Sequence, residues 1–166
     1  MDTDLRIERV AITHPDAVLL VEAVQEEYVA RYGGRDESPI NPAHFEDPHG
    51  QFFVGYLAGV PVATGAWRRS AVEALGASVT AEIKRMYVVP AAQRRGHARR
   101  MLAHLESTAA AAGIEGLVLE TGLKQPEAIE LYTSAGYEPV PAFGYYAGAP
   151  LSRTFGRRLR SGELHR

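Results

Sequence analysis

The stretch from residue 83 to residue 100 constrains the fold of this chain more than any other, because a strand pattern passes there directly into an amphipathic helix. Its sequence is IKRMYVVPAAQRRGHARR. The first turn of a helix carries backbone N–H groups without an intrahelical acceptor, and the helix dipole adds about half a positive charge there. Gly96 allows a close backbone approach, and arginines surround it. The segment therefore predicts a cradle for a phosphorylated ligand.

A helix and a second strand follow this cradle. Apolar residues recur at helical spacing from Arg95 to Ala112, and residues 116–121 have the pattern of a short buried strand. A strand, a helix and a parallel strand form a right-handed crossover. Ligands bind at the mouths of such crossovers, so the fold itself favours a site at the cradle.

The rest of the pattern predicts a mixed sheet flanked by helices. Before the cradle we expect a strand near 5–11, a helix over 15–31, a short helix starting at Asn41, an antiparallel hairpin over 51–67 and a strand over 79–89. After it we expect a helix over 126–135 and strands over 137–140 and 152–157. The predicted class is α/β, in one domain, with a mixed and mostly antiparallel sheet and about four helices.

Composition narrows the function classes. The 166 residues suit one domain over 1–160 with a polar tail over 161–166, and a net charge of −2 gives no general attraction to nucleic acid. The chain has no cysteine, which excludes a cysteine nucleophile or a thiolate metal site. The acidic N-terminus lacks a secretion signal and no segment has the length of a membrane span, so we expect a cytoplasmic protein without a membrane partner.

One further cluster of polar residues could suggest a metal. His44, Asp47 and His49 lie close together in the sequence, yet they lack the i, i+4 spacing of a helical ligand pair. A solvated loop accounts for them better, and we expect no metal site.

Residues 93–98, with the sequence QRRGHA, fit the coenzyme-binding pattern of the GNAT superfamily of acetyl-coenzyme A dependent N-acetyltransferases: Gln or Arg, two residues, Gly, one residue, then Gly or Ala. Residues 128–137, AIELYTSAGY, resemble the second signature of that family. The resemblance implies acetyl-CoA as cosubstrate and a GNAT-like sheet that splays open between two parallel strands. It extends closely from Ala81 to about Val140, and dimers are frequent among similar proteins, so a homodimer is an open alternative.

The resemblance also implies a cofactor site. Backbone groups near Met86 and Val88 would bond the pantetheine arm, residues 94–99 would hold the diphosphate, and Tyr132 would lie near the sulfur. Gln125 stands where the family usually has Asn. The cofactor-binding set is Met86, Tyr87, Val88, Gln93, Arg94, Arg95, Gly96, His97, Ala98, Arg99 and Gln125.

Attack of an amine on a thioester requires a proton donor for the thiolate and an acceptor for the amine proton. Tyr132, with an ordinary pKa of about 10 against about 8.5 for a thiol, is the expected general acid; the alternative is that its ring only packs under the helix. Glu82 is the expected base, at the spacing of the catalytic Glu in the family's histone acetyltransferase branch. It could equally be an exposed carboxylate paired with Lys84. Glu120 is the second candidate, and either could act through water.

These features predict direct transfer of an acetyl group to a primary amine of a small molecule or peptide in a ternary complex, because no cysteine can carry the acetyl group. Arg68, Arg69 and Arg85 near strand ends suggest an acceptor with a carboxylate. A regulatory module that binds acetyl-CoA without turnover is the alternative. Binding of nucleic acid through the arginines of the cradle is a third, which the acidic balance disfavours.

Overall fold

The computed structural model describes residues 4–37 and 40–159. The predicted tail over 161–166 lies outside them, and the boundaries of the predicted domain stay a prediction. Contacts divide the chain into two compact units. Unit 1 comprises residues 1–68 and 84–105, and unit 2 comprises residues 69–83 and 106–166.

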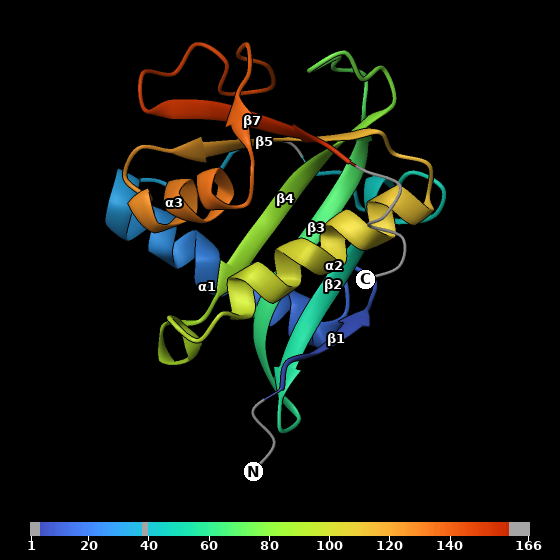
Figure 1. Cartoon of the computed structure of the whole chain (residues 1–166). Helices are drawn as coiled ribbons and strands as arrows, with labels where there is room; N and C mark the ends of the chain where they lie inside the picture. The colour runs from blue at the N-terminus through green and yellow to red at the C-terminus, as the bar shows by residue number, and fades with distance from the viewer. Residues whose placement is uncertain (1–3, 38–39, 160–166) are drawn as a thin grey trace. The chain divides into compact units, whose positions relative to one another are not determined.

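The elements along the chain are those of an α/β fold (Figure 1). The strands are β1 (Arg6–Arg9), β2 (Gly50–Leu57), β3 (Val60–Ser70), β4 (Thr80–Val88), β5 (Gly116–Gly122), β6 (Glu138–Pro139) and β7 (Ser152–Arg158). The helices are α1 (Pro15–Tyr32), α2 (His97–Ala111) and α3 (Pro126–Ser134), with 3-10 turns η1 (Pro42–Phe45) and η2 (Pro90–Ala92).

The strands form a seven-stranded mixed sheet in the order β1-β2-β3-β4-β5-β7-β6. The pairs β1/β2, β2/β3, β5/β7 and β6/β7 are antiparallel, and β4/β5 is parallel. The parallel ladder joins residues 80–82 of β4 to residues 116–118 of β5. The predicted fold class is therefore confirmed.

The predicted number of about four helices is slightly too high for the described residues, which contain three α-helices. The helix expected from Asn41 is a single 3-10 turn, although Asn41 caps it as predicted, by accepting the N–H of Ala43 at 3.1 Å. The strand expected over 137–140 is shorter, spanning Glu138–Pro139. The order of all the other elements agrees with the prediction.

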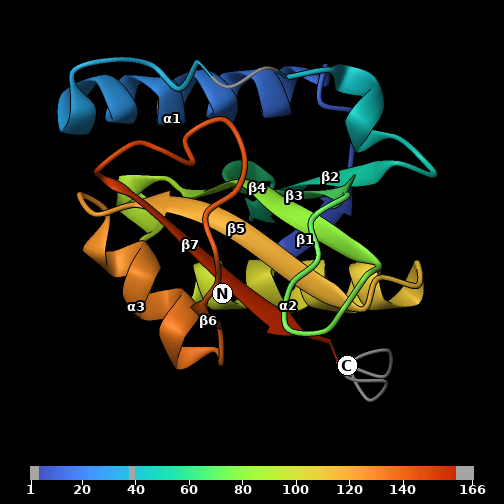
Figure 2. The same ribbon diagram turned by 90° about the horizontal axis from the view of Figure 1, so that it is seen from above.

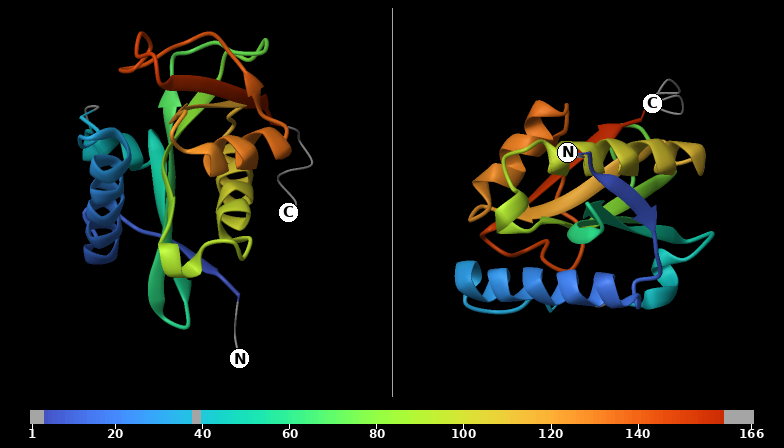
Figure 3. Two further views of the ribbon diagram at one scale, coloured as in Figure 1. Left: turned by 90° about the vertical axis from the view of Figure 1, so that its left-hand side faces the viewer. Right: turned by 90° about the horizontal axis from the view of Figure 1, so that it is seen from below.

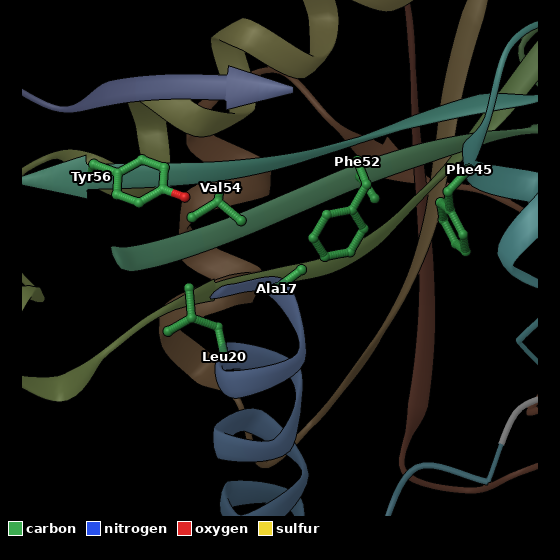
Figure 4. Packing of buried hydrophobic residues seen from close by; sticks show 7 residues of the cluster. Ala17, Leu20, Phe45, Phe52, Val54 and Tyr56 are labelled. Atoms are coloured by element: carbon green, nitrogen blue, oxygen red, sulfur yellow. The ribbon is translucent and has the colours of Figure 1, made fainter. Parts of the chain in front are cut away.

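In unit 1, helix α1 covers one face of the strands and the start of α2 covers the opposite face (Figure 3). The core on the α1 side is formed by seven residues, shown in part in Figure 4: Ala17, Leu20, Phe45, Phe52, Val54, Tyr56 and Ala66. The next residue along β2, Phe53, points the other way and its ring makes an edge contact with His104 of α2, with centroids 4.6 Å apart. This alternation buries β2 on both faces.

Unit 2 is organised around β5, whose residues Leu117, Val118 and Leu119 are almost completely buried. Strand β7 runs antiparallel beside it over the full length of β5 (Figure 2), with Gly116 opposite Arg158 and Gly122 opposite Ser152. Helix α3 begins four residues after β5, at Pro126, where a proline is tolerated because the first helical N–H needs no partner. Tyr132 is its buried residue.

Candidate functional site

The last residues of β4, in unit 1, present two backbone donors on one edge. Val89 donates its N–H to the carbonyl of Val62 on β3, at 2.9 Å. N–H groups alternate between the two edges of an extended strand, so those of Val88 and Met86 point to the edge opposite β3. Met86 and Met101 pack their side chains against Gly65, and Tyr87 packs on the α1 core. The predicted donors for a pantetheine arm are thus held in a rigid strand and aimed away from β3.

A short turn connects this strand to α2. Residues Pro90–Ala92 form the 3-10 turn η2, closed by a hydrogen bond from Ala92 N–H to the Val89 carbonyl at 2.9 Å. Gln93 donates its side-chain amide to the carbonyl of Val88, 2.9 Å away. This bond fixes the turn to the strand, and the contact of Gln93 with the cofactor stays a prediction.

The turn then adopts the conformation of an anion-binding loop. Arg94 and Gly96 both have left-handed backbones, with φ of 64° and 84°. A Cβ atom on Gly96 would meet nothing within 4 Å, so the glycine is required by its φ and faces open space. The first helical bond of α2 runs from Arg100 N–H to the Gly96 carbonyl, at 3.1 Å. Helix geometry thus leaves the N–H groups of His97 and Ala98 without an acceptor in the helix.

Positive charge surrounds this loop. The residues Arg94, Arg95 and Arg99 are exposed, and Arg100, also exposed, lies 3.4 Å from Asp4. Exposed guanidinium groups at the start of a helix add mobile charge to the fixed donors of the backbone. The arrangement suits a diphosphate, as the sequence predicted, and all of it lies in unit 1.

His97 is the one predicted cradle residue that is buried, with 4% of its surface exposed. Burial lowers its pKa, and the charges of Arg100 and Arg95 lower it further. Its Nδ1 atom has no hydrogen-bond partner within the described residues. The imidazole is therefore neutral near pH 7, and it leaves the positive charge of the loop to the arginines.

Unit 2 contains the predicted general acid and the predicted Gln contact. Tyr132 has 4% of its surface exposed, and its ring meets the ring of Tyr137 at 5.6 Å in an edge arrangement. Gln125 is half-buried at the N-terminus of α3, where its carbonyl accepts the N–H of Ala128 at 3.0 Å. The Tyr132 ring thus packs against Tyr137, and its chemical role stays a prediction.

The two candidate bases also lie in unit 2, on adjacent strands. Glu82 pairs with Val118 at the last step of the parallel ladder, and it has 7% of its surface exposed. The alternative expected an exposed carboxylate, and the burial of Glu82 contradicts that part of it. Glu120 lies two residues farther along β5, and its carboxylate touches Gly144, where a Cβ would come within 2.5 Å of Oε1. The loop between β6 and β7 thus covers Glu120.

Two polar residues outside the predicted set of site residues contact Arg85 in unit 1. Thr64 donates its hydroxyl to the Arg85 carbonyl at 2.6 Å, and Asp36 accepts from Arg85 Nη1 at 2.7 Å. The signal for Thr64 was a lone hydroxyl in the apolar run of β3. Arg85 itself lies three residues before the end of β4, and its side chain is buried against Asp36. Arg69, by contrast, is in unit 2 and donates to the carbonyl of Ala112 at 3.1 Å.

Two features of the described residues bear on other functions. No helix in residues 4–37 and 40–159 is long and apolar enough to cross a membrane. Over the same residues no three acidic, His or Cys side chains gather as metal ligands do. His44 and His49 accordingly lie in or beside the turn that leads into β2.

Known proteins resemble this chain in sequence and in fold. The sequence profile of the Acetyltransferase (GNAT) family matches residues 20–137. An IAA acetyltransferase of Azospirillum brasilense is 36% identical over 143 residues, which cover 82% of this chain and 87% of the relative.

Solved structures agree. A protein of Klebsiella pneumoniae described as an acyl-CoA N-acyltransferase has a TM-score of 0.76 at 27% identity, covering 96% of this chain and all of that one. The PaiA N-acetyltransferase of Thermoplasma acidophilum, solved in complex with coenzyme A, has a TM-score of 0.67 at 13% identity, covering 94% and 99%. The profile match, the relative and the fold together show that this chain belongs to the GNAT family of N-acetyltransferases, enzymes that take the acetyl group from acetyl-CoA and act on small-molecule or peptide amines.

Proposed function

We propose that this enzyme moves the acetyl group of acetyl-CoA directly to a primary amine of a small molecule or peptide, within a ternary complex. The observation that supports this most strongly is the continuous run in unit 1 from the donor edge of β4 to the open N-terminus of α2. A strand edge suits the amides of pantetheine, and a helix start with arginines suits a diphosphate. Both halves of acetyl-CoA therefore have a matching surface.

The cofactor contacts follow from that run. The N–H groups of Met86 and Val88 bond the pantetheine arm, and Tyr87 keeps the strand seated on the α1 core. The loop donors from Gly96 to Ala98 and the side chains of the exposed arginines hold the diphosphate. Gln93 acts by anchoring the turn to Val88, and Gln125 contributes its amide to the cofactor from the start of α3.

Tyr132 is the proposed general acid. As the amine nitrogen attacks the thioester carbon, a C–N bond forms and the C–S bond breaks, and the departing thiolate takes the phenol proton of Tyr132. A hydrogen bond from a Val88 or neighbouring N–H polarises the carbonyl as negative charge develops on its oxygen. The burial of Tyr132 supports the proposal, since a fixed ring loses little freedom when it meets the sulfur.

Glu82 is the proposed base. It takes the amine proton, directly or through water, and that proton returns to the Tyr132 oxygen by way of water, so the net products are an amide and free coenzyme A. Its burial on β4 supports the assignment, because a carboxylate shielded from water responds strongly to a nearby ammonium. Glu120 stays the second candidate: it is half-buried, whereas Glu82 is buried, and its carboxylate lies against Gly144.

The proposed acceptor is the primary amine of a small molecule or peptide. That this acceptor also has a carboxylate is a hypothesis, which rests on the positive charges of Arg68 and Arg69. The name of the Azospirillum brasilense relative adds the compound abbreviated IAA to the set to be tested. A cytoplasmic location and a homodimeric state also stay predictions for this protein.

A screen for release of free thiol from acetyl-CoA tests the function, with amines, polyamines, amino acids and peptides as acceptors. We expect turnover with at least one class, and intersecting initial-velocity lines that indicate a ternary complex. Tyr132→Phe should still bind acetyl-CoA in calorimetry but lose most of the thiol release. Binding without turnover across the panel would favour a regulatory module, and ping-pong lines would contradict direct transfer.

A further inference from the structure

Arg85 carries an unusual backbone for a residue inside a strand. Its φ is 56°, in the left-handed region that non-glycine residues seldom adopt, and it lies between regular strand residues of β4. A left-handed residue costs free energy and persists only where its surroundings hold it. The surroundings of Arg85 in unit 1 hold it from two sides.

The first contact holds the backbone of Arg85. Thr64 of β3 is completely buried, and its hydroxyl donates to the Arg85 carbonyl at 2.6 Å. A hydroxyl at this place does what a backbone N–H does in a regular ladder, but it reaches the carbonyl from a side chain. It therefore accommodates the displaced carbonyl that the left-handed φ creates.

The second contact holds the side chain. Arg85 Nη1 lies 2.7 Å from Oδ2 of Asp36, and the two side chains are 4% and 14% exposed. Asp36 is itself fixed to α1, because its N–H donates to Gln25 Oε1 at 2.8 Å and its carbonyl accepts from Gln25 Nε2 at 3.3 Å. A chain of contacts thus runs from α1 through the following loop to β4.

The buried Nε of the Arg85 guanidinium has no hydrogen-bond partner among the described residues. An unmatched buried donor is unfavourable, as is the left-handed backbone. Both unfavourable features sit at one residue, immediately before the segment whose N–H groups point away from β3. Such a concentration of strain is typical of sites where geometry serves function.

We propose that Thr64 and Asp36 are positioning residues for acetyl transfer: by fixing the left-handed backbone of Arg85, they set the direction of the Met86 and Val88 N–H groups. This inference rests on the proposed function, in which those N–H groups bond the acetyl-CoA thioester arm. Beyond that function, a buried network that extends from α1 and β3 sets the direction in which the Met86 and Val88 N–H groups point. Arg85 acts through the conformation of its backbone.

Thr64→Val tests the proposal, because valine keeps the shape of threonine and removes only the hydroxyl. We expect kcat for acetyl transfer to fall about tenfold, with the KM for acetyl-CoA changed less than threefold, since the diphosphate contacts remain. Thr64→Ser keeps the hydroxyl and should restore kcat to within about twofold of the wild type. Circular dichroism and melting curves establish that the variants are folded.

Asp36→Asn is the second arm, and it also serves if Thr64→Val fails to fold. The asparagine amide has the shape of the Asp36 carboxylate but no negative charge, so it holds the Arg85 guanidinium less firmly. We therefore expect a several-fold loss of kcat at nearly constant KM. Equal kcat values in wild type, Thr64→Val and Asp36→Asn, with only lower melting temperatures, would overturn the positioning role. Absence of acetyl transfer by the wild-type enzyme would instead count against the proposed function, so the two failures are distinguishable.

Discussion

Tyr137 donates its hydroxyl to Oε2 of Glu106 across 2.9 Å in the interior of unit 2. The same oxygen accepts from Arg157 Nη1 at 2.7 Å, so one carboxylate in the second half of α2 joins the residue before β6 and strand β7. Burial and the nearby charge of Glu106 raise the pKa of Tyr137 well above its ordinary value. The phenol therefore remains a donor at every pH at which the protein is handled.

Replacement of Glu106 by leucine should destabilise the protein by about 3 kcal/mol, because it leaves the partly buried guanidinium of Arg157 without its carboxylate. Tyr137→Phe should cost about 1 kcal/mol, the net value of one hydrogen bond. Denaturant unfolding measures both. A double variant combining the two changes should cost less than their sum, and strict additivity would show that the two hydrogen bonds act independently.

Gly50→Ala should be severely destabilising. A Cβ there would lie 2.2 Å from the His44 carbonyl oxygen and 2.4 Å from that of Trp67, and both are backbone atoms that cannot rotate away. The loss expected is more than about 3 kcal/mol, or failure to accumulate as soluble protein. Gly34→Ala is the matched control, because nothing lies within 4 Å of its Cβ position. It should change the stability by less than about 1 kcal/mol.

Acidification should destabilise the protein through His97 and His104. Burial lowers the pKa of both, so the folded state resists a proton that the unfolded chain accepts below about pH 6.5. Their contribution is complete above that pH and is lost as the pH falls from about 6.5 through the lowered folded pKa. The double variant with glutamine at both positions should lose less stability between pH 7 and pH 5 than the wild type. An identical slope in the two proteins would contradict the assignment.

Binding of acetyl-CoA should have the opposite effect on His97 if the diphosphate sits at the start of α2. Negative charge near the imidazole raises its pKa, so binding near pH 6 should take up protons. Calorimetry in two buffers of different ionisation enthalpy measures the uptake, and His97→Gln should abolish most of it.

The elements with strong periodicity were predictable from the sequence almost to the residue. Helix α2, expected over 95–112, spans 97–111, and β5 and α3 agree equally well because glycines and a proline mark their ends. The turn at Asn41 was wrong in type because four residues between a cap and a following loop are too few for an α-helix. Hydrophobic periodicity is a local signal, so it predicts an element well only where that element is long enough to repeat the pattern.

The backbone of the candidate site was predictable from the sequence, whereas the side-chain contacts around it were not. The glycine and arginines of the cradle lie as expected, since a strand, a turn and a helix determine them. The amide of Gln93 turns back to the strand, and the guanidinium of Arg85 turns inward to Asp36, a residue 49 positions earlier. Such long-range partners leave no periodic signal in a single sequence.

Removal of positive charge from the cradle should weaken the binding of acetyl-CoA, because it weakens the contacts with the diphosphate and leaves those with the pantetheine arm unchanged. Arg95→Gln and Arg99→Gln should each raise the dissociation constant about fivefold at low salt, in line with about 1 kcal/mol for an exposed charge pair. The effect should shrink at 0.5 M salt, where a Debye length of about 4 Å screens it. Acetyl-pantetheine, which lacks the diphosphate, should bind the wild type and both variants equally. Arg153→Gln is the control, because Arg153 is at the start of β7, donates to the carbonyls of Pro150 and Ser152 and is not one of the cradle residues. Equal losses for the two ligands, or a loss in the control, would place the diphosphate elsewhere.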